Sequence, residues 1–207
     1  MPDSAHWKAK SHREGYDVMR ERLTSSAWEF ACQRGLSKLT LNAVAEQAGC
    51  ARSSVYRYFD SKEELLGAVF QDQVLALGDE VENEIKRWSD PREQFVRGLY
   101  LAVNMIRSGP VLELFRTVML DGGGRHLADI AMEFIPAIAS DLMQLGSTDS
   151  LAQRRGAIRE DLSDEEILRW LLIVGMSMVQ LSPGTDEEEE LAYLRKMLVP
   201  AIFSAAE

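Results

Sequence analysis

The sequence contains little that supports disulfide, redox or metal chemistry. Its 207 residues include only two cysteines, Cys32 and Cys50, too few for a disulfide framework, so both are expected to be reduced thiols of a cytoplasmic protein. Its three histidines, His6, His12 and His126, have neither the i,i+4 spacing nor the neighbouring cysteines of common zinc sites. We therefore predict no metal site and no cofactor.

Long apolar runs and catalytic motifs are also missing. The longest apolar run, Leu171 to Val174 with a broken continuation to Leu181, is far too short to cross a bilayer, and the N-terminus lacks the apolar core of a signal peptide. No Gly-x-Ser-x-Gly motif or catalytic carboxylate pair stands out, and the glycines at 122–124 lack the Lys-Ser/Thr of a phosphate-binding loop. These absences argue against a membrane protein and against an enzyme, and they leave residues 122–124 as a hinge or loop.

Positive charge is scarce overall but concentrated near the N-terminus. The formal net charge of −10 by itself argues against nucleic-acid binding. Residues 1–62, however, contain ten Lys and Arg and seven Asp and Glu, a formal charge of +3, so the remaining residues carry −13. A basic head on an acidic body is expected of a protein that approaches phosphates with one end only.

The apolar periodicity is helical along the whole chain, and no stretch alternates long enough to indicate a strand. It predicts an all-α fold with a three-helix head at residues 1–62 and a helical body at residues 63–207. Residues 1–14 are polar and expected to be loose. The predicted helices span residues 15–33, 41–48, 52–59, 61–88, 92–107, 111–120, 126–145 and 164–181, and capping boxes open two of them at Ser61-x-x-Glu64 and Ser163-x-x-Glu166. A last helix is expected to begin in the acidic run 186–190, to carry Leu191, Leu194, Leu198 and Ile202, and to bend or end at Pro200.

The segment from Leu41 to Phe59 has the spacing of a helix-turn-helix. Ala45 is the small residue needed where two helices cross, Gly49 is the turn residue four positions on, and Val55 is the buried aliphatic six positions further. The other inward positions hold Val44, Ala48, Cys50 and Tyr58, and we interpret the Cys50 thiol as structural rather than as a redox sensor.

The outer face of residues 52–58 carries the side chains that suit a DNA major groove. Arg can contact guanine bidentately, and Ser can pair with several base edges. Side chains at the helix ends and flanks, such as Tyr56, Thr40 and Lys62, suit phosphate contacts. This face consists of Arg52, Ser53, Ser54, Tyr56 and Arg57.

This segment resembles the signature of the TetR family of transcriptional regulators. The resemblance covers residues 20–66 and is carried by Thr40-Leu-Asn-Ala-Val-Ala, Ala48-Gly, Ser54-Val-Tyr-Arg-Tyr-Phe and Ser61-Lys-Glu-Glu-Leu. It implies a homodimer of about nine helices per chain that binds a palindromic operator, usually as a repressor released by a small ligand.

Matched position by position, the resemblance implies a set of DNA contacts. Ala51 departs from the Ser or Thr that is common before the recognition helix, so one helix cap and one phosphate contact are in question. The implied base contacts come from Arg52, Ser53 and Ser54, the implied phosphate contacts from Thr40, Tyr56, Tyr58 and Lys62, and Asn42 is a further DNA-binding candidate.

Three assignments in the head keep two interpretations each. Tyr58 suits either the core or a phosphate, and Arg57 suits either DNA or a carboxylate of the body. The basic arm made of Lys8, Lys10 and Arg13 suits either the DNA backbone or a minor groove.

The body offers a candidate dimer interface on its last two helices. The helix at 164–181 is apolar almost all round, and such a helix is either central or shared with a second chain. The competing interpretation is that both helices close the core of their own chain. The predicted interface residues are Leu171, Val174, Met178, Leu191, Leu194 and Leu198.

The middle helices offer a candidate ligand pocket, for which the competing interpretation is a filled core. The predicted lining is Phe95, Leu99, Tyr100, Val103, Phe115, Met119, Phe134, Ile138 and Trp170. The sequence thus predicts a DNA-binding repressor that works as a homodimer and is released by a small, mainly apolar effector. The alternatives are a dimeric DNA-binding regulator without a ligand and, more remotely, an enzyme or carrier with a vestigial head.

Overall fold

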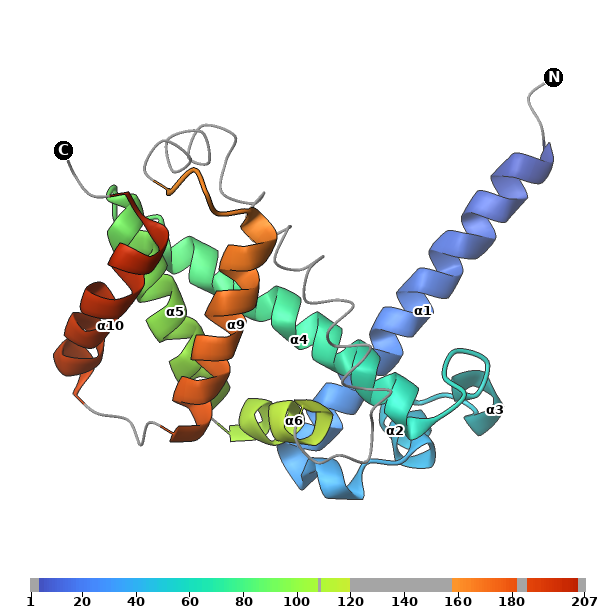
Figure 1. Cartoon of the computed structure of the whole chain (residues 1–207). Helices are drawn as coiled ribbons and strands as arrows, with labels where there is room; N and C mark the ends of the chain where they lie inside the picture. Colours follow the sequence, from blue (N-terminus) through green and yellow to red (C-terminus); the bar gives the residue numbers. More distant parts are fainter. Residues whose placement is uncertain (1–3, 108, 120–157, 182–185, 205–207) are drawn as a thin grey trace. The chain divides into compact units, whose positions relative to one another are not determined.

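The described part of the chain is helical, which confirms the all-α prediction (Figure 1). The computed structural model describes residues 4–107, 109–119, 158–181 and 186–204. One isolated β-bridge, between Ile158 and Phe203, accompanies the helices in these residues. The elements are α1 Ser4–Arg34, the 3₁₀ helix η1 Leu36–Lys38, α2 Leu41–Ala48, α3 Arg52–Val55, α4 Lys62–Ile85, α5 Pro91–Arg107, α6 Gly109–Met119, α9 Asp164–Leu181 and α10 Glu187–Ile202.

The described residues fall into two compact units. The head unit contains residues 4–72 and 113–119, and the body unit contains the described residues of 73–112 together with 158–181 and 186–204. The hinge expected at 122–124 and the helix expected at 126–145 lie outside the described residues. Every helix that the structure describes is too short or too polar to span a lipid bilayer.

Helix α1 begins much earlier than the sequence pattern predicted. Residues 1–14 were expected to be loose, but the helix extends from Ser4 to Arg34, where Gly35 ends it with a φ of 87°. Between Pro2 and Gly15 no proline or glycine interrupts the chain, and Ala, Lys, Arg and Glu are strong helix formers. Val18 was expected to point inward but is exposed.

The head unit has its own apolar core. Helix α1 packs against α2, and α2 packs against α3. The side chains with no exposed surface here are Leu23, Ala27, Val44, Val55, Phe59 and Leu65. These residues come from α1, α2, α3, the turn after α3 and the start of α4, so the core fixes the geometry of the helix-turn-helix.

Three helices that lack a basic residue in their own last turn receive an arginine from elsewhere. Helices α2, α9 and α10 have no Lys or Arg in that turn. Arg22 of α1 donates to the Ala48 carbonyl, Arg107 of α5 donates to the Met178 carbonyl at 2.9 Å, and Arg159 donates to the Ala201 carbonyl at 3.2 Å. Carbonyls at a helix C-terminus lack intrahelical donors and favour a nearby cation. Each arginine thus joins two elements and stabilises a helix end.

In the body unit, α5 packs against both α9 and α10. Gly175 of α9 allows this close approach, because a Cβ added there would lie 3.3 Å from Leu99 Cδ1. Arg195 of α10 donates to Glu93 of α5 at 2.7 Å, and this hydrogen bond is the main cause that lowers the pKa of Glu93. Helix α5 is therefore the central element of the described body unit.

The α10 residues of the predicted dimer seam are buried inside the single chain. Leu191, Leu194 and Leu198 are at most 1% exposed in the single chain, so they have almost no surface left to offer a partner. The spacing identified an apolar face correctly, but that face belongs to the chain's own core. Met178 is also buried, while Leu171 and Val174 are half-buried.

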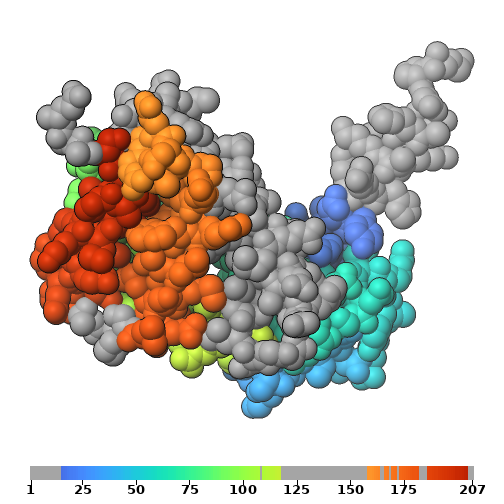
Figure 2. All heavy atoms as spheres, viewed as in Figure 1, coloured from blue at the N-terminus to red at the C-terminus, as the bar shows by residue number. Residues whose placement is uncertain are grey.

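Other large apolar side chains of the same two helices are exposed. They are Ile173, Leu181, Tyr193 and Met197, each more than half exposed, at 58%, 81%, 57% and 51%. Figure 2 shows α9 and α10, in orange and red, both open to the surface on the viewed side of the body unit. We call these four residues the α9–α10 outer face.

Candidate nucleic-acid interface

The turn of the helix-turn-helix is built as its residue types require. The Thr40 hydroxyl caps α2 by accepting a hydrogen bond from the Ala43 amide at 3.1 Å. Gly49 ends α2 in the left-handed region with a φ of 63°, and the next amide, of Cys50, donates to the Ala45 carbonyl at 3.0 Å. Glycine adopts this conformation without a steric penalty, so the chain can turn directly from α2 into α3.

Removal of the Thr40 hydroxyl should destabilise the head. Thr40→Ala is expected to lower the free energy of unfolding by about 1 kcal/mol, because the Ala43 amide loses its acceptor at the N-terminus of α2. Thr40→Ser keeps the acceptor and serves as the matched control. Thermal unfolding followed by circular dichroism measures both variants, and equal melting temperatures for Thr40→Ala and the parent chain would contradict the capping role.

Helix α3 is shorter than predicted. The helix was expected to reach Phe59 but ends at Val55, and the residues after it form tighter turns in which the Arg57 and Tyr58 amides donate to carbonyls only three residues back. Ala51, at the N-cap, supplies no side-chain hydrogen bond, so the helix also starts without a cap. Phe59 is fully buried, which anchors the end of this segment in the head core.

The predicted DNA-contacting residues are distributed unevenly between surface and interior. Val55 is fully buried, so the neighbouring positions of α3 form an outward face. The exposed residues are Thr40, Arg52, Ser53, Tyr56 and Arg57, and the half-buried ones are Asn42, Ser54, Tyr58 and Lys62. Cys50, which was expected to be buried, is half-buried.

Two of these side chains have partners that the sequence did not reveal. Arg52 lies 3.8 Å from the Glu46 carboxylate of α2, with both side chains mostly exposed. The Lys62 ammonium donates to the Leu36 carbonyl at 3.3 Å, so it ties the start of α4 to η1. The exposed ion pair between Arg52 and Glu46 contributes little stability, so the Arg52 side chain stays available to a stronger partner.

The structure also bears on the open assignments of Tyr58, to the core or to a phosphate contact, and of Arg57, to DNA or to a carboxylate of the body. Tyr58 packs its ring on Tyr16 of α1, with centroids 4.6 Å apart, and remains half-buried. Arg57 is exposed and has no ion-pair partner among the residues that the structure describes. The Tyr16 contact could not be predicted, because Tyr16 and Tyr58 lie far apart in the sequence and no local pattern connects them.

The capping box at the start of α4 differs in one detail from the expected one. The Ser61 hydroxyl accepts from the Glu64 amide at 3.1 Å as predicted, but the Glu64 carboxylate accepts from the Asp60 amide at 2.7 Å rather than from that of Ser61. At the start of α9, Ser163 and Glu166 form the reciprocal pair in full. Both helices that follow the boxes therefore begin where the sequence indicated.

The residues of the predicted ligand pocket belong to different parts of the chain. Val103 and Phe115 are buried, the first in the body unit and the second in the head unit. Phe95 is half-buried and packs edge-on against Phe203, with ring centroids 5.3 Å apart. The half-buried residues Leu99, Tyr100 and Trp170 are in the body unit, and the Met119 side chain, Phe134 and Ile138 lie outside the described residues.

Polar groups accompany these apolar residues on α5. Burial raises the pKa of the Tyr100 hydroxyl, and the carboxylates of Glu187 and Glu190 raise it further. Asn104 donates to the Tyr100 carbonyl at 3.0 Å, and its side-chain oxygen accepts from Arg107 at 3.1 Å. A pocket at this face of α5 remains a prediction.

Comparison with known proteins points in the same direction as the geometry. Residues 23–69 match the model of the family described as bacterial regulatory proteins, tetR family. A helix-turn-helix-type transcriptional regulator of Mycobacterium tuberculosis is 27% identical over 190 residues, which cover 92% of this chain and 88% of that protein. The fatty acid metabolism regulator protein of Bacillus subtilis is 26% identical over 73 residues, 35% of this chain and 38% of that protein.

Solved structures share the fold over most of the chain. RolR in complex with resorcinol has a TM-score of 0.65 at 18% identity, with 92% of this chain and 90% of RolR covered. FadR of Thermus thermophilus, a TetR-family transcriptional repressor in complex with lauroyl-CoA, has a TM-score of 0.63 at 20% identity, with 91% of this chain and 97% of FadR covered. The likeness extends beyond the helix-turn-helix into the helical body.

Proposed function

The chain is a DNA-binding transcriptional regulator of the TetR family rather than an enzyme, and from that premise we propose that it is a repressor. As a homodimer it binds a palindromic operator, and a small, mainly apolar ligand releases it. The single observation that carries the proposal is the outward face of residues 52–57, held by a buried Val55 on a closed head core.

On DNA, the exposed face of α3 enters the major groove of one half-site. Arg52 and Ser53 are exposed and reach base edges, Ser54 is half-buried beside them, and Tyr56 lies at the end of the helix, where a phosphate oxygen is accessible. Thr40 and Asn42 approach the backbone from the start of α2, whereas Lys62 acts both on a phosphate and on the Leu36 carbonyl.

The dimer forms through the α9–α10 outer face. A single chain leaves the four large apolar side chains of this face in water, and a second copy placed by a twofold axis covers them with the same face. Two heads related by that axis then meet two half-sites related by the operator's own symmetry.

The effector binds in the helical body and acts through α4. This helix continues without interruption from Lys62 to Ile85 and contains the boundary between the head and body units, after Asp72. The similar structures of RolR and FadR are complexes with resorcinol, a small aromatic diol, and with lauroyl-CoA, a fatty-acyl thioester, and both ligands support an effector with an apolar part. A ligand that binds better to one position of α4 shifts the equilibrium away from the arrangement of the heads that binds DNA. By thermodynamic linkage, DNA must then weaken ligand binding by the same factor by which the ligand weakens DNA binding.

Arg52 provides the sharpest test of the DNA-binding role. Duplexes enriched by the protein from a randomised library serve as specific probes, and a scrambled duplex serves as the nonspecific one. Arg52→Ala should reduce discrimination at one base pair by about 1–3 kcal/mol. Arg52→Lys keeps the charge but lacks the bidentate fork, so it should retain affinity for the scrambled duplex and still lose discrimination. Equal losses on both duplexes for the two variants would remove Arg52 from base recognition.

A further inference from the structure

Helix α1 extends far beyond the helix-turn-helix that it supports. From Ser4 to Tyr16 the helix rises by about 18 Å at 1.5 Å per residue. Figure 1 shows this N-terminal part continuing past α2 and α3 within the head unit. Among residues 15–34 of α1, whose burial the structure describes, the first buried side chain is that of Leu23.

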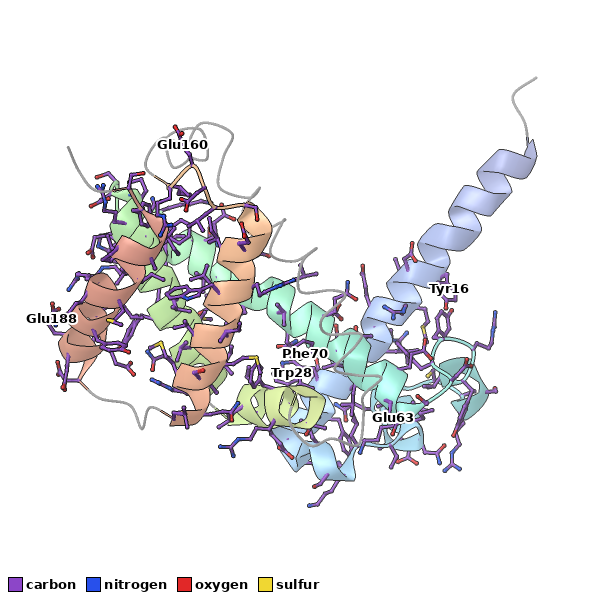
Figure 3. All side chains as sticks on the ribbon, viewed as in Figure 1. Tyr16, Trp28, Glu63, Phe70, Glu160 and Glu188 are labelled. Carbon is purple, nitrogen blue, oxygen red and sulfur yellow. The ribbon has the colours of Figure 1, made fainter. Side chains whose placement is uncertain are left out.

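Aromatic contacts fix the direction of the extension relative to α3. The Tyr16 ring packs on Tyr58 with centroids 4.6 Å apart, and the Arg20 guanidinium lies 5.1 Å from the centre of the Phe59 ring. Tyr16, labelled in Figure 3, therefore marks the place where α1 leaves the end of the recognition segment. Since an α-helix is stiff over this length, the earlier residues continue from a defined point beside the DNA-facing surface.

The extension is basic. Residues 4–15 contain Lys8, Lys10 and Arg13 and a single acidic residue, Glu14. Arg13 lies seven positions before Arg20, close to two full turns, so these two positions share a face, while Lys8 and Lys10 occupy positions on opposite sides of it. The three basic positions are therefore distributed around the helix axis.

We propose that residues 4–15 of α1 form a phosphate-binding extension that grips the operator outside the base pairs contacted by α3. The proposal rests on the operator-binding function described above and adds a second contact region to it. Its length of about 18 Å corresponds to roughly five base-pair steps of 3.4 Å, so the added contacts should lie in the DNA that flanks each half-site. These contacts add affinity and salt dependence but no base preference.

The test separates flanking DNA from general charge. Affinities are measured by fluorescence anisotropy on two duplexes enriched from a randomised library, one trimmed to the core site and one with flanks of about eight base pairs on each side. The variant Lys8→Gln/Lys10→Gln/Arg13→Gln removes the three charges with a residue that favours helix. The matched control, Lys86→Gln/Arg87→Gln/Lys196→Gln, removes three exposed charges from the body unit.

The parent chain and the body control should bind the flanked duplex roughly tenfold or more tightly than the trimmed one, with a steeper salt dependence. The extension variant should bind both duplexes alike, at the affinity of the parent for the trimmed duplex. If the flanks raise the affinity of all three proteins equally, the proposal is overturned. It is also overturned if the extension variant still binds the flanked duplex more tightly but differs from the parent in thermal stability without DNA, because the extension would then contact the protein rather than DNA. Failure of the parent chain to enrich any duplex would instead overturn operator binding itself, and this inference with it.

Discussion

Replacement of Glu190 by alanine is expected to lower the free energy of unfolding by about 3–5 kcal/mol. The Glu190 carboxylate accepts two hydrogen bonds from Arg107, at 3.0 and 3.2 Å, and the two side chains are only 6% and 15% exposed. Without the carboxylate, Arg107 keeps its charge in a region with little water. An uncompensated buried charge costs far more than an exposed ion pair contributes.

Arg107 makes this cost unavoidable, because it also serves α9. Its guanidinium donates to the Met178 carbonyl, which belongs to the last turn of a helix that ends at Leu181 and so lacks an intrahelical donor. The side chain cannot leave the interior without exposing that carbonyl. Arg107 therefore connects α5, α9 and α10 at one point of the body unit.

Two comparisons isolate the buried charge in urea unfolding. Glu189→Ala makes the same change one residue earlier, at an exposed position, and should alter stability by no more than about 0.5 kcal/mol. The double variant Arg107→Met/Glu190→Met removes both charges and should recover much of the loss, since apolar pairs of similar volume often replace buried ion pairs well. If Glu190→Ala is as mild as Glu189→Ala, the pair does not hold the three helices together.

The helix-turn-helix could be predicted from sequence because its signals are local. The sequence marks Gly49 as the turn residue and Val55 as the buried aliphatic, each within a few residues of its partners, and the structure shows both in those roles. The end of α3 was overestimated, because composition does not reveal that the turns after Val55 tighten.

The burial of α10 shows what periodicity cannot provide. The spacing of Leu191, Leu194 and Leu198 reports that one face is apolar, but not whether α5 of the same chain or a second chain covers it. The long-range contacts that Arg22, Arg107 and Arg159 make within the chain were missed for a related reason. Each joins residues distant in sequence, and no local pattern marks an arginine that caps another helix.

The double variant Ile173→Glu/Met197→Glu is expected to convert the protein into a folded monomer that has lost most of its operator affinity. Both side chains are more than half exposed in the single chain, so charge there leaves the core intact while four carboxylates would face one another across the proposed twofold axis. A dimer binds both half-sites with two linked heads, whereas a monomer binds only one half-site at a time. The operator affinity of the monomer should therefore be lower by about 10²–10⁴-fold.

Two controls distinguish loss of the interface from loss of the fold. Leu75→Glu places a charge on an exposed apolar side chain of α4, outside the α9–α10 outer face, and should leave the dimer intact. Leu194→Glu places a charge in the core and should unfold the body rather than yield a native monomer. Analytical ultracentrifugation with circular dichroism measures all three variants. A twofold interface cannot tolerate four buried like charges at its centre. If the Ile173→Glu/Met197→Glu protein still sediments as a native dimer, the chains therefore associate through another surface.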